Sequence, residues 1–194
     1  AAQLGSSSLR MALLETLGRM SGPEATALAS ATLANSSDPR EIALLAQNLE
    51  RQAPGEHREA ALAAARAALA QASGGRLEGK DVGPLFEVLK NFGGAGAVTD
   101  FQSAADGPWK YYATIALADL PQGAGVTALK QMVTDPQNSA ASTRVAALQA
   151  VAQLSADNTD ARELLLDQAR KGSIPPATWI NVAAALAGDR FAIG

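Results

Sequence analysis

The stretch "LKQMVTDPQNSAASTRVAALQAVAQL", residues 129–154, decides the fold. It contains two apolar helix patterns, which are separated by a polar turn at the Asp-Pro pair 135–136, because proline interrupts a helix. In the second pattern Ala147, Val151 and Leu154 recur at helical spacing. The stretch therefore predicts two consecutive helices that fold back on each other across a short turn.

Similar helix signals recur along the whole chain, and strand patterns are nearly absent. "SGPE" (21–24) and "DPRE" (38–41) each combine a capping residue, a proline and a glutamate at capping-box spacing, so we expect Ser21 and Asp38 to cap helices. The longest loop-like interval is 73–83. We predict an all-α fold of about eleven helices. The second helices of the expected hairpins are 23–35, 56–71, 96–106, 124–134 and 160–171. The helix expected at 108–120 and the terminal helix expected at 175–188 belong to the other set.

Apolar pairs four residues apart repeat along the alternate helices with a period of about 33 residues and one longer step near 73–83. The period predicts stacked helical hairpins. An irregular bundle with similar helix lengths is the alternative, and a tetratricopeptide array has a stricter period than this one. In the first helix we expect Leu9, Leu13, Leu17 and Met20 to share one packed face. The pairs are Leu13/Leu17, Leu45/Leu49, Leu85/Leu89, Ala116/Leu120, Ala150/Leu154 and Val182/Leu186.

These residues resemble HEAT-like repeats. Asp38 and Asp135 stand near the turn aspartate of that family, and Arg10 and Arg144 stand near its helix-opening arginine. The resemblance implies a right-handed α-solenoid of about five hairpins plus a terminal helix, forming one domain over 1–194. It also implies a ladder of Asp–Arg contacts between repeats, although the middle units lack the arginine.

Most of the few aromatic residues lie between 86 and 112, and three of them, Trp109, Tyr111 and Tyr112, fall within four positions. On the helix expected at 108–120, apolar side chains cover so wide an arc that the helix belongs inside a stack. We expect the aromatic residues mainly to fill the core. Tyr111, which is nearest the polar edge formed by Lys110 and Thr114, is the one we expect to be exposed.

The composition excludes several classes of function. The net charge is −3 and no basic stripe is present, so no nucleic-acid partner is expected. The DNA-binding, glycosylase-like role that the HEAT-like resemblance also suggests is therefore a distant third choice. There is no cysteine and only one histidine, His57, so no metal site, catalytic constellation or cofactor is expected. "FGGAGAV" (92–98) lacks the spacing of a dinucleotide loop. No apolar run approaches the roughly 20 residues needed for membrane insertion.

The sequence therefore predicts a non-enzymatic scaffold that binds a protein or peptide on the curved surface of a helical-repeat array. The alternative is an enzyme or small-ligand protein with a pocket between repeats near 92–112, and a purely structural spacer is a third possibility. The start "AAQLGSSS" indicates a piece of a longer protein, whose other domains are expected partners, and together with the absent cysteine it slightly favours a periplasmic or secreted location. The candidate partner-binding residues are Trp109, Tyr111, Arg58, Arg66, Asp100, Lys130 and Arg162.

Overall fold

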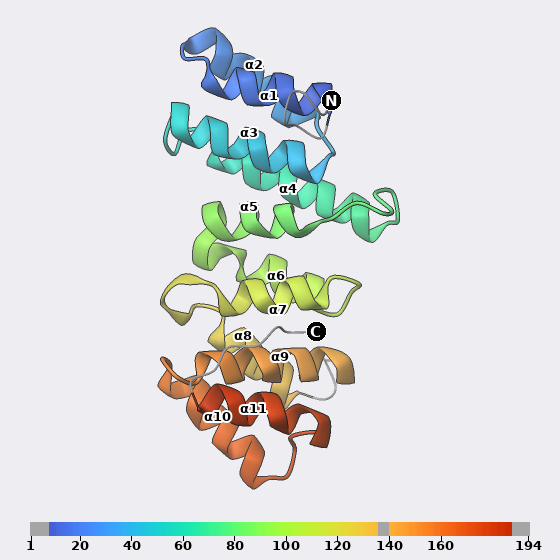
Figure 1. Ribbon diagram of the computed structural model, residues 1–194, viewed down its shortest axis with the longest axis vertical. Helices are drawn as coiled ribbons and strands as arrows, with labels where there is room; N and C mark the ends of the chain where they lie inside the picture. The colour runs from blue at the N-terminus through green and yellow to red at the C-terminus, as the bar shows by residue number, and fades with distance from the viewer. Residues whose placement is uncertain (1–7, 136–139, 188–194) are drawn as a thin grey trace. The chain divides into compact units, whose positions relative to one another are not determined.

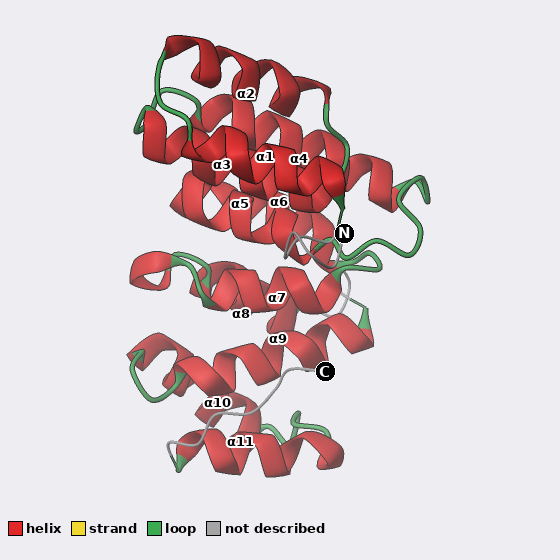
Figure 2. Cartoon of the chain, turned by 45° about the horizontal axis from the view of Figure 1, so that its top comes forward, coloured by secondary structure: helices red, strands yellow, loops and turns green. Residues whose placement is uncertain are grey.

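The computed structural model describes residues 8–135 and 140–187 (Figure 1). The regular structure of these residues is entirely helical, with no strand in the described ranges, so the all-α prediction is confirmed (Figure 2). The described residues form two compact units, one ending at Gly93 and the other beginning at Gly94. The first seven residues and Pro136, which entered the predictions above, lie outside the described residues.

The first unit consists of two layers of helices (Figure 1). In one layer α1 packs against α3, and α3 packs against α5. In the other layer α2 packs against α4, and each of these two helices also contacts the first layer. The helices are α1 (Leu9–Arg19), α2 (Pro23–Asn35), α3 (Pro39–Gln52), α4 (Arg58–Ser73) and α5 (Gly83–Gly93).

The second unit repeats this arrangement. Helix α9 packs against both α7 and α11, while α8 packs against α7, α9 and α10, and α6 packs against α7. Its α-helices are α6 (Val98–Ala105), α7 (Lys110–Ala118), α8 (Val126–Thr134), α9 (Ala141–Leu154), α10 (Thr159–Arg170) and α11 (Trp179–Leu186). Short 3₁₀ turns are η2 (Gly94–Ala97), η3 (Pro121–Gly123) and η4 (Pro176–Thr178).

Local capping explains where several helices begin. Asp38 caps α3, because its Oδ1 accepts a hydrogen bond from the backbone N–H of Arg40 at 3.0 Å, and Pro39 follows as the first helical residue. The expected cap at Ser21 is wrong. Gly22 holds the N-cap position of α2 with a φ of +118°, a conformation that favours glycine, and no side chain caps this helix.

Helix α7 is shorter than the predicted 108–120 and runs from Lys110 to Ala118. Leu120 has an extended conformation, with φ −65° and ψ 139°. The cause is Pro121, because a residue that precedes proline is disfavoured in the helical region.

The packed face predicted for α1 is only partly right. Leu17 is buried together with Leu14, whereas Leu9, Leu13 and Met20 are each more than half exposed. Helix α1 packs against α2 and α3, and its buried residues are Leu14 and Leu17. By contrast, the predicted pairs inside the first unit, Leu45/Leu49 and Leu85/Leu89, have no exposed surface. In the last predicted pair, Val182 is buried and Leu186 is exposed, so only one member is buried, as in the first pair, Leu13/Leu17.

A glycine sets the distance between α7 and α8. A Cβ atom added at Gly125 would lie 2.0 Å from the carbonyl oxygen of Leu117, which is backbone and cannot move aside without shifting a helix. Leu117 itself is fully buried. Glycine at 125 is therefore required for this helix contact.

We expect Gly125→Ala to lower the free energy of unfolding by about 3 kcal/mol, because overpacking forces a backbone shift. Gly96→Ala is the matched control, since a Cβ at Gly96 meets no atom within 4 Å. That variant should change stability by less than about 1 kcal/mol, and in the favourable direction. Urea unfolding followed by circular dichroism measures both, and equal stability of the two variants would contradict the role given to Gly125.

Candidate functional site

The aromatic residues divide into a buried set and an exposed set. Phe86 and Phe101 are buried, which confirms core packing for these two. Tyr111 and Tyr112 are 38% and 41% exposed, so the core-filling prediction fails for the tyrosines. The prediction that Tyr111 reaches the surface is correct, but Tyr112 does so equally.

Helix α7 buries a different face from the one predicted. Thr114, expected at the polar edge, has no exposed surface, and its hydroxyl donates to the carbonyl oxygen of Lys110 at 2.8 Å. This bond inside the helix satisfies the hydroxyl, so the threonine methyl group can pack in the core. Ile115 is 38% exposed, so α7 is not enclosed to the extent that its wide apolar arc predicted. Alanines 113 and 116 take the buried positions beside Thr114.

Ile115 follows Tyr111 by four residues and Tyr112 by three, so its side chain lies next to both tyrosines on the surface of α7. We call these three side chains the α7 patch. The ammonium group of Lys110 lies 5.3 Å from the ring centroid of Tyr111, within cation–π range. The same ammonium donates to Ser142 Oγ on α9 at 3.0 Å. The tyrosine is therefore held by a lysine that is itself anchored on a neighbouring helix.

Trp109 supports the other tyrosine. Its ring meets that of Tyr112 edge to face, with centroids 6.5 Å apart and an interplanar angle of 66°. Trp109 is half-buried, and its Nε1 is a buried donor without a hydrogen-bond partner among the described residues. Of the predicted candidates, Trp109 and Tyr111 are thus brought together at one end of α7.

Two of the candidate arginines hold turns between helices. Arg58, at the start of α4, donates from Nε to both carboxylate oxygens of Glu50 at 3.0 and 3.1 Å, which ties α4 to α3. Arg162 of α10 donates to the carbonyl oxygens of Ser155 and Ala156 at 2.9 and 2.8 Å, which closes the turn after α9. Both arginines already have structural partners.

The other candidates do not gather into one site. Arg66 is exposed on α4 in the first unit, and Lys130 is exposed on α8 in the second. Asp100 is half-buried on α6. Of the seven candidates, Tyr111 is the one that belongs to the α7 patch, and Trp109 lies against that patch through its contact with Tyr112.

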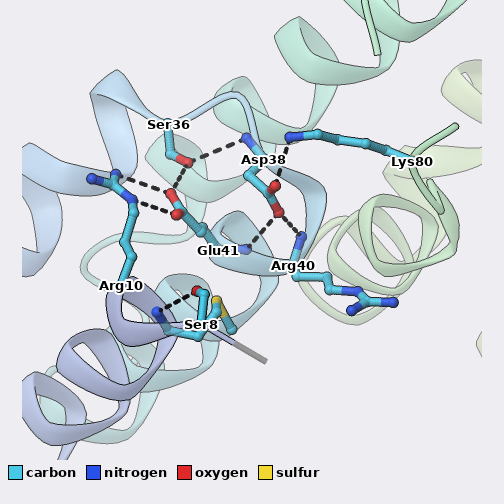
Figure 3. A network of polar contacts seen from close by, with 8 residues as sticks. Ser8, Arg10, Ser36, Asp38, Arg40, Glu41 and Lys80 are labelled. Carbon is cyan, nitrogen blue, oxygen red and sulfur yellow. Dashed lines mark hydrogen bonds and ion pairs between the residues drawn. The ribbon is translucent and has the colours of Figure 1, made fainter. Parts of the chain in front are cut away.

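A polar network that the sequence analysis did not predict joins α1, α3 and the loop before α5 (Figure 3). Arg10 donates from Nε and Nη2 to the two carboxylate oxygens of Glu41, the second contact being 3.0 Å. The hydroxyl of Ser36 also donates to Glu41, at 2.8 Å. Asp38, besides capping α3, accepts from Lys80 Nζ at 2.7 Å. Three elements distant in sequence are thus connected through two carboxylates.

This network differs from the Asp–Arg contacts that the resemblance implied. The expected residue Arg10 is used, but its partner is Glu41, while Asp38 binds a lysine. Lys80 belongs to the stretch 73–83, where the repeat pattern is interrupted. No periodic pattern marks Lys80, so sequence reasoning had no signal for it.

A cavity of about 310 Å³ lies beside the network. Its lining includes Arg40 and Lys80 together with the carboxylates of Asp38, Glu41 and Asp81. Lys80 already neutralises Asp38, and Arg10 neutralises Glu41. We therefore regard this cavity as part of a structural junction between helices.

The charges of the network shift two carboxyl pKa values downward. The hydrogen bond from Arg10 is the main cause for Glu41, and burial of Glu41 opposes it only in part. Burial of Asp38 disfavours its ionised form, but Lys80 and the N–H of Arg40 together outweigh burial and lower the pKa. Both carboxylates are consequently more stable as anions in the folded chain than in the unfolded one.

We expect Glu41→Gln to lower the free energy of unfolding at neutral pH by about 1 kcal/mol, because charge-assisted hydrogen bonds are lost. A lowered pKa contributes stability above the ordinary pKa of a glutamate, and this stability is lost as the pH falls through the lowered value. The difference between wild type and variant should therefore shrink between pH 7 and pH 3. Glu24→Gln, which removes an exposed carboxylate from α2, controls for net charge. A difference that stays constant with pH would contradict the assignment.

The described residues hold no group of three or more acidic, histidine or cysteine side chains that could bind a metal ion. None of the described helices is long and apolar enough to cross a membrane. The cavity beside the network includes no residue of 92–112, where the alternative interpretation expected a pocket. No protein-family model matches the chain, and neither a curated protein nor a solved structure matches it significantly.

Proposed function

We propose that the chain is a non-enzymatic scaffold of HEAT-like helical hairpins that binds a peptide segment of a protein partner through the α7 patch. The HEAT-like type, the right-handed solenoid and the repeat count of about five hairpins are part of this proposal. The two-layer packing of alternate helices within each unit supports it, because stacked hairpins pack in this way.

The observation that carries the proposal is the exposure of Tyr111, Tyr112 and Ile115 on one face of α7. Aromatic residues make up only 4% of the chain, yet two of them are at the surface here while Phe86 and Phe101 are in the core. Tyrosines with restricted motion are typical of protein interfaces, since they bury a large area at little cost in side-chain entropy.

The contacts of the patch also indicate what it binds. The ammonium group of Lys110 lies over the ring of Tyr111 and provides one positive charge beside an apolar surface. A partner segment with an apolar side chain next to an acidic residue matches this combination. One lysine does not supply the several phosphate contacts on which nucleic-acid binding depends.

The test is selection of peptides from a random library on the wild-type chain, followed by affinity measurements on variants by isothermal titration calorimetry. We expect Tyr111→Ala combined with Ile115→Ala to lower the affinity for the selected peptides by at least about tenfold, as truncation of hot-spot residues does. Leu166→Ala is the matched control, because Leu166 on α10 is a large apolar residue with a similar exposure of 40%. This variant should bind the selected peptides with an affinity within about twofold of that of the wild type.

Circular dichroism must show that all variants are as helical as the wild type. Selected peptides that bind the α7 variant as tightly as the wild type would overturn the proposed site. A library that yields no binding peptide would overturn the peptide-binding function itself.

A further inference from the structure

Large apolar side chains that are more than half exposed are concentrated on two helices of the described residues, α1 and α11. They are Leu9, Leu13 and Met20 of α1 and Ile180 of α11, and the one other such residue, Leu28, is on α2, which packs against α1. At 75%, Ile180 is the most exposed of them. Apolar side chains that gather in this way, rather than being scattered singly, mark interaction sites.

The exposed apolar residues of α1 form a stripe along the helix. Leu9, Leu13 and Thr16 stand four and three positions apart, which is the spacing of a seam between two packed helices, and Met20 at the C-cap continues it. The hydroxyl of Thr16 donates to the carbonyl oxygen of Ala12 at 2.8 Å, so this polar group is satisfied inside its own helix. We call Leu9, Leu13, Thr16 and Met20 the α1 stripe.

Helix α11 presents a second stripe with the same spacing. Trp179, Ala183 and Leu186 are all exposed and stand four and three positions apart, and Ile180 is the neighbour of Ala183 one turn before it. We call these four residues the α11 stripe.

Helix α11 is therefore apolar on two sides. Val182 and Ala185 are buried on the helix, which packs on α9, and no residue of α11 carries a charge. A helix with one packed side and one side in water normally carries polar or charged residues on the second side. The composition of α11 is that of a helix with packing partners on both sides.

Both stripes belong to helices that have a single neighbour in their own layer among the described residues. Helix α3 packs between α1 and α5, and α9 packs between α7 and α11. By contrast, α1 packs in its layer on α3, and α11 packs in its layer on α9. Stacked helices of this kind bury their second side on the next helix of the layer. A helix that continues the layer therefore fits each stripe.

The charges beside the stripes favour a contact between α1 and α11. Arg10 and Arg19 are exposed on the two sides of the α1 stripe. Pairing of α1 with the α1 of another copy would bring four arginines to one contact, and like charges placed together are unfavourable. Helix α11 brings no charge to the contact.

We propose that the chain associates head to tail with a second copy of itself, the α1 stripe of one copy packing on the α11 stripe of the other. The contact continues the layer of α7, α9 and α11 with the α1 of the next copy. Ala183 is small, so a leucine of the α1 stripe can approach the backbone of α11 there. The association goes beyond the proposed peptide binding and uses no residue of the α7 patch.

The test is sedimentation equilibrium of the whole chain at several concentrations. The average mass of the wild type should rise above that of the monomer with a dissociation constant of about 10–100 µM, because a contact between two short helices is small. Leu13→Glu and Ile180→Glu should each raise this constant at least about tenfold, since each places a charge inside an apolar contact. Leu166→Glu is the matched control, because Leu166 is an exposed leucine of α10 outside both stripes, and it should associate like the wild type.

A mixture of the two variants tests the head-to-tail arrangement itself. Leu13→Glu keeps an intact α11 stripe, and Ile180→Glu keeps an intact α1 stripe. An equimolar mixture should therefore form heterodimers although neither variant associates alone. Variants that had failed to fold could not restore association in this way.

A wild type that remains monomeric up to about 1 mM would overturn this inference. Association of Ile180→Glu alone would indicate pairing of α1 with α1, and association of Leu13→Glu alone would indicate pairing of α11 with α11, so either result contradicts the head-to-tail contact. A mixture that stays monomeric contradicts it as well. Loss of association in Leu166→Glu would place the interface on another surface. Peptide binding by the α7 patch stands or fails separately from all of these outcomes.

Discussion

Helices α7 and α8 come so close at Gly125 that even one methyl group would collide with a backbone carbonyl, and small residues control packing in much of the second unit. Half of the buried residues of α7, and half of those of α9, are alanine. Alanine brings helix axes close together, and interiors at native density leave few voids larger than a water molecule. Large side chains therefore have little room between these helices. The exposure of Tyr111 and Tyr112 follows from this constraint, because the positions facing the neighbouring helices are taken by Ala113 and Ala116.

Close packing leaves the helix ends as the places for polar contacts. In the first unit Asp38 caps α3 and binds Lys80, and Glu41 binds Arg10 from α1. In the second unit Thr143 Oγ1 of α9 donates to the carbonyl oxygen of Ala105 at the end of α6, at 3.1 Å. Apart from the cap, these bonds join residues more than 30 positions apart in sequence, so they fix which helix ends lie together, whereas apolar packing alone is less selective about register.

The sequence predicted local features well and spatial ones poorly. The start of α3 was predictable because Asp38 and Pro39 act on their own helix, and the pair Leu45/Leu49 was recognisable from spacing alone. Which face of α7 is buried was not predictable, because a helical wheel gives the angles between side chains but does not say which neighbours surround them. Thr114 shows the difficulty, because its hydroxyl is satisfied inside its own helix and no longer marks a polar face. Lys80 was unpredictable because its partner is 42 residues away and no pattern connects the two.

The same constraint bears on where binding can occur in the second unit. Helix α9 contacts α7, α8, α10 and α11, and every residue from 146 to 152 is buried. A helix enclosed in this way can offer a ligand only its end. The first turns of α9 are the part that carries Arg144 and Val145, both half-buried, and a second cavity lies there. Helix α7 differs, since its tyrosines and Ile115 lie on a side that its packing partners leave uncovered. Alanine-rich packing thus leaves two kinds of surface accessible: the end of an enclosed helix and the outer face of a partly covered one.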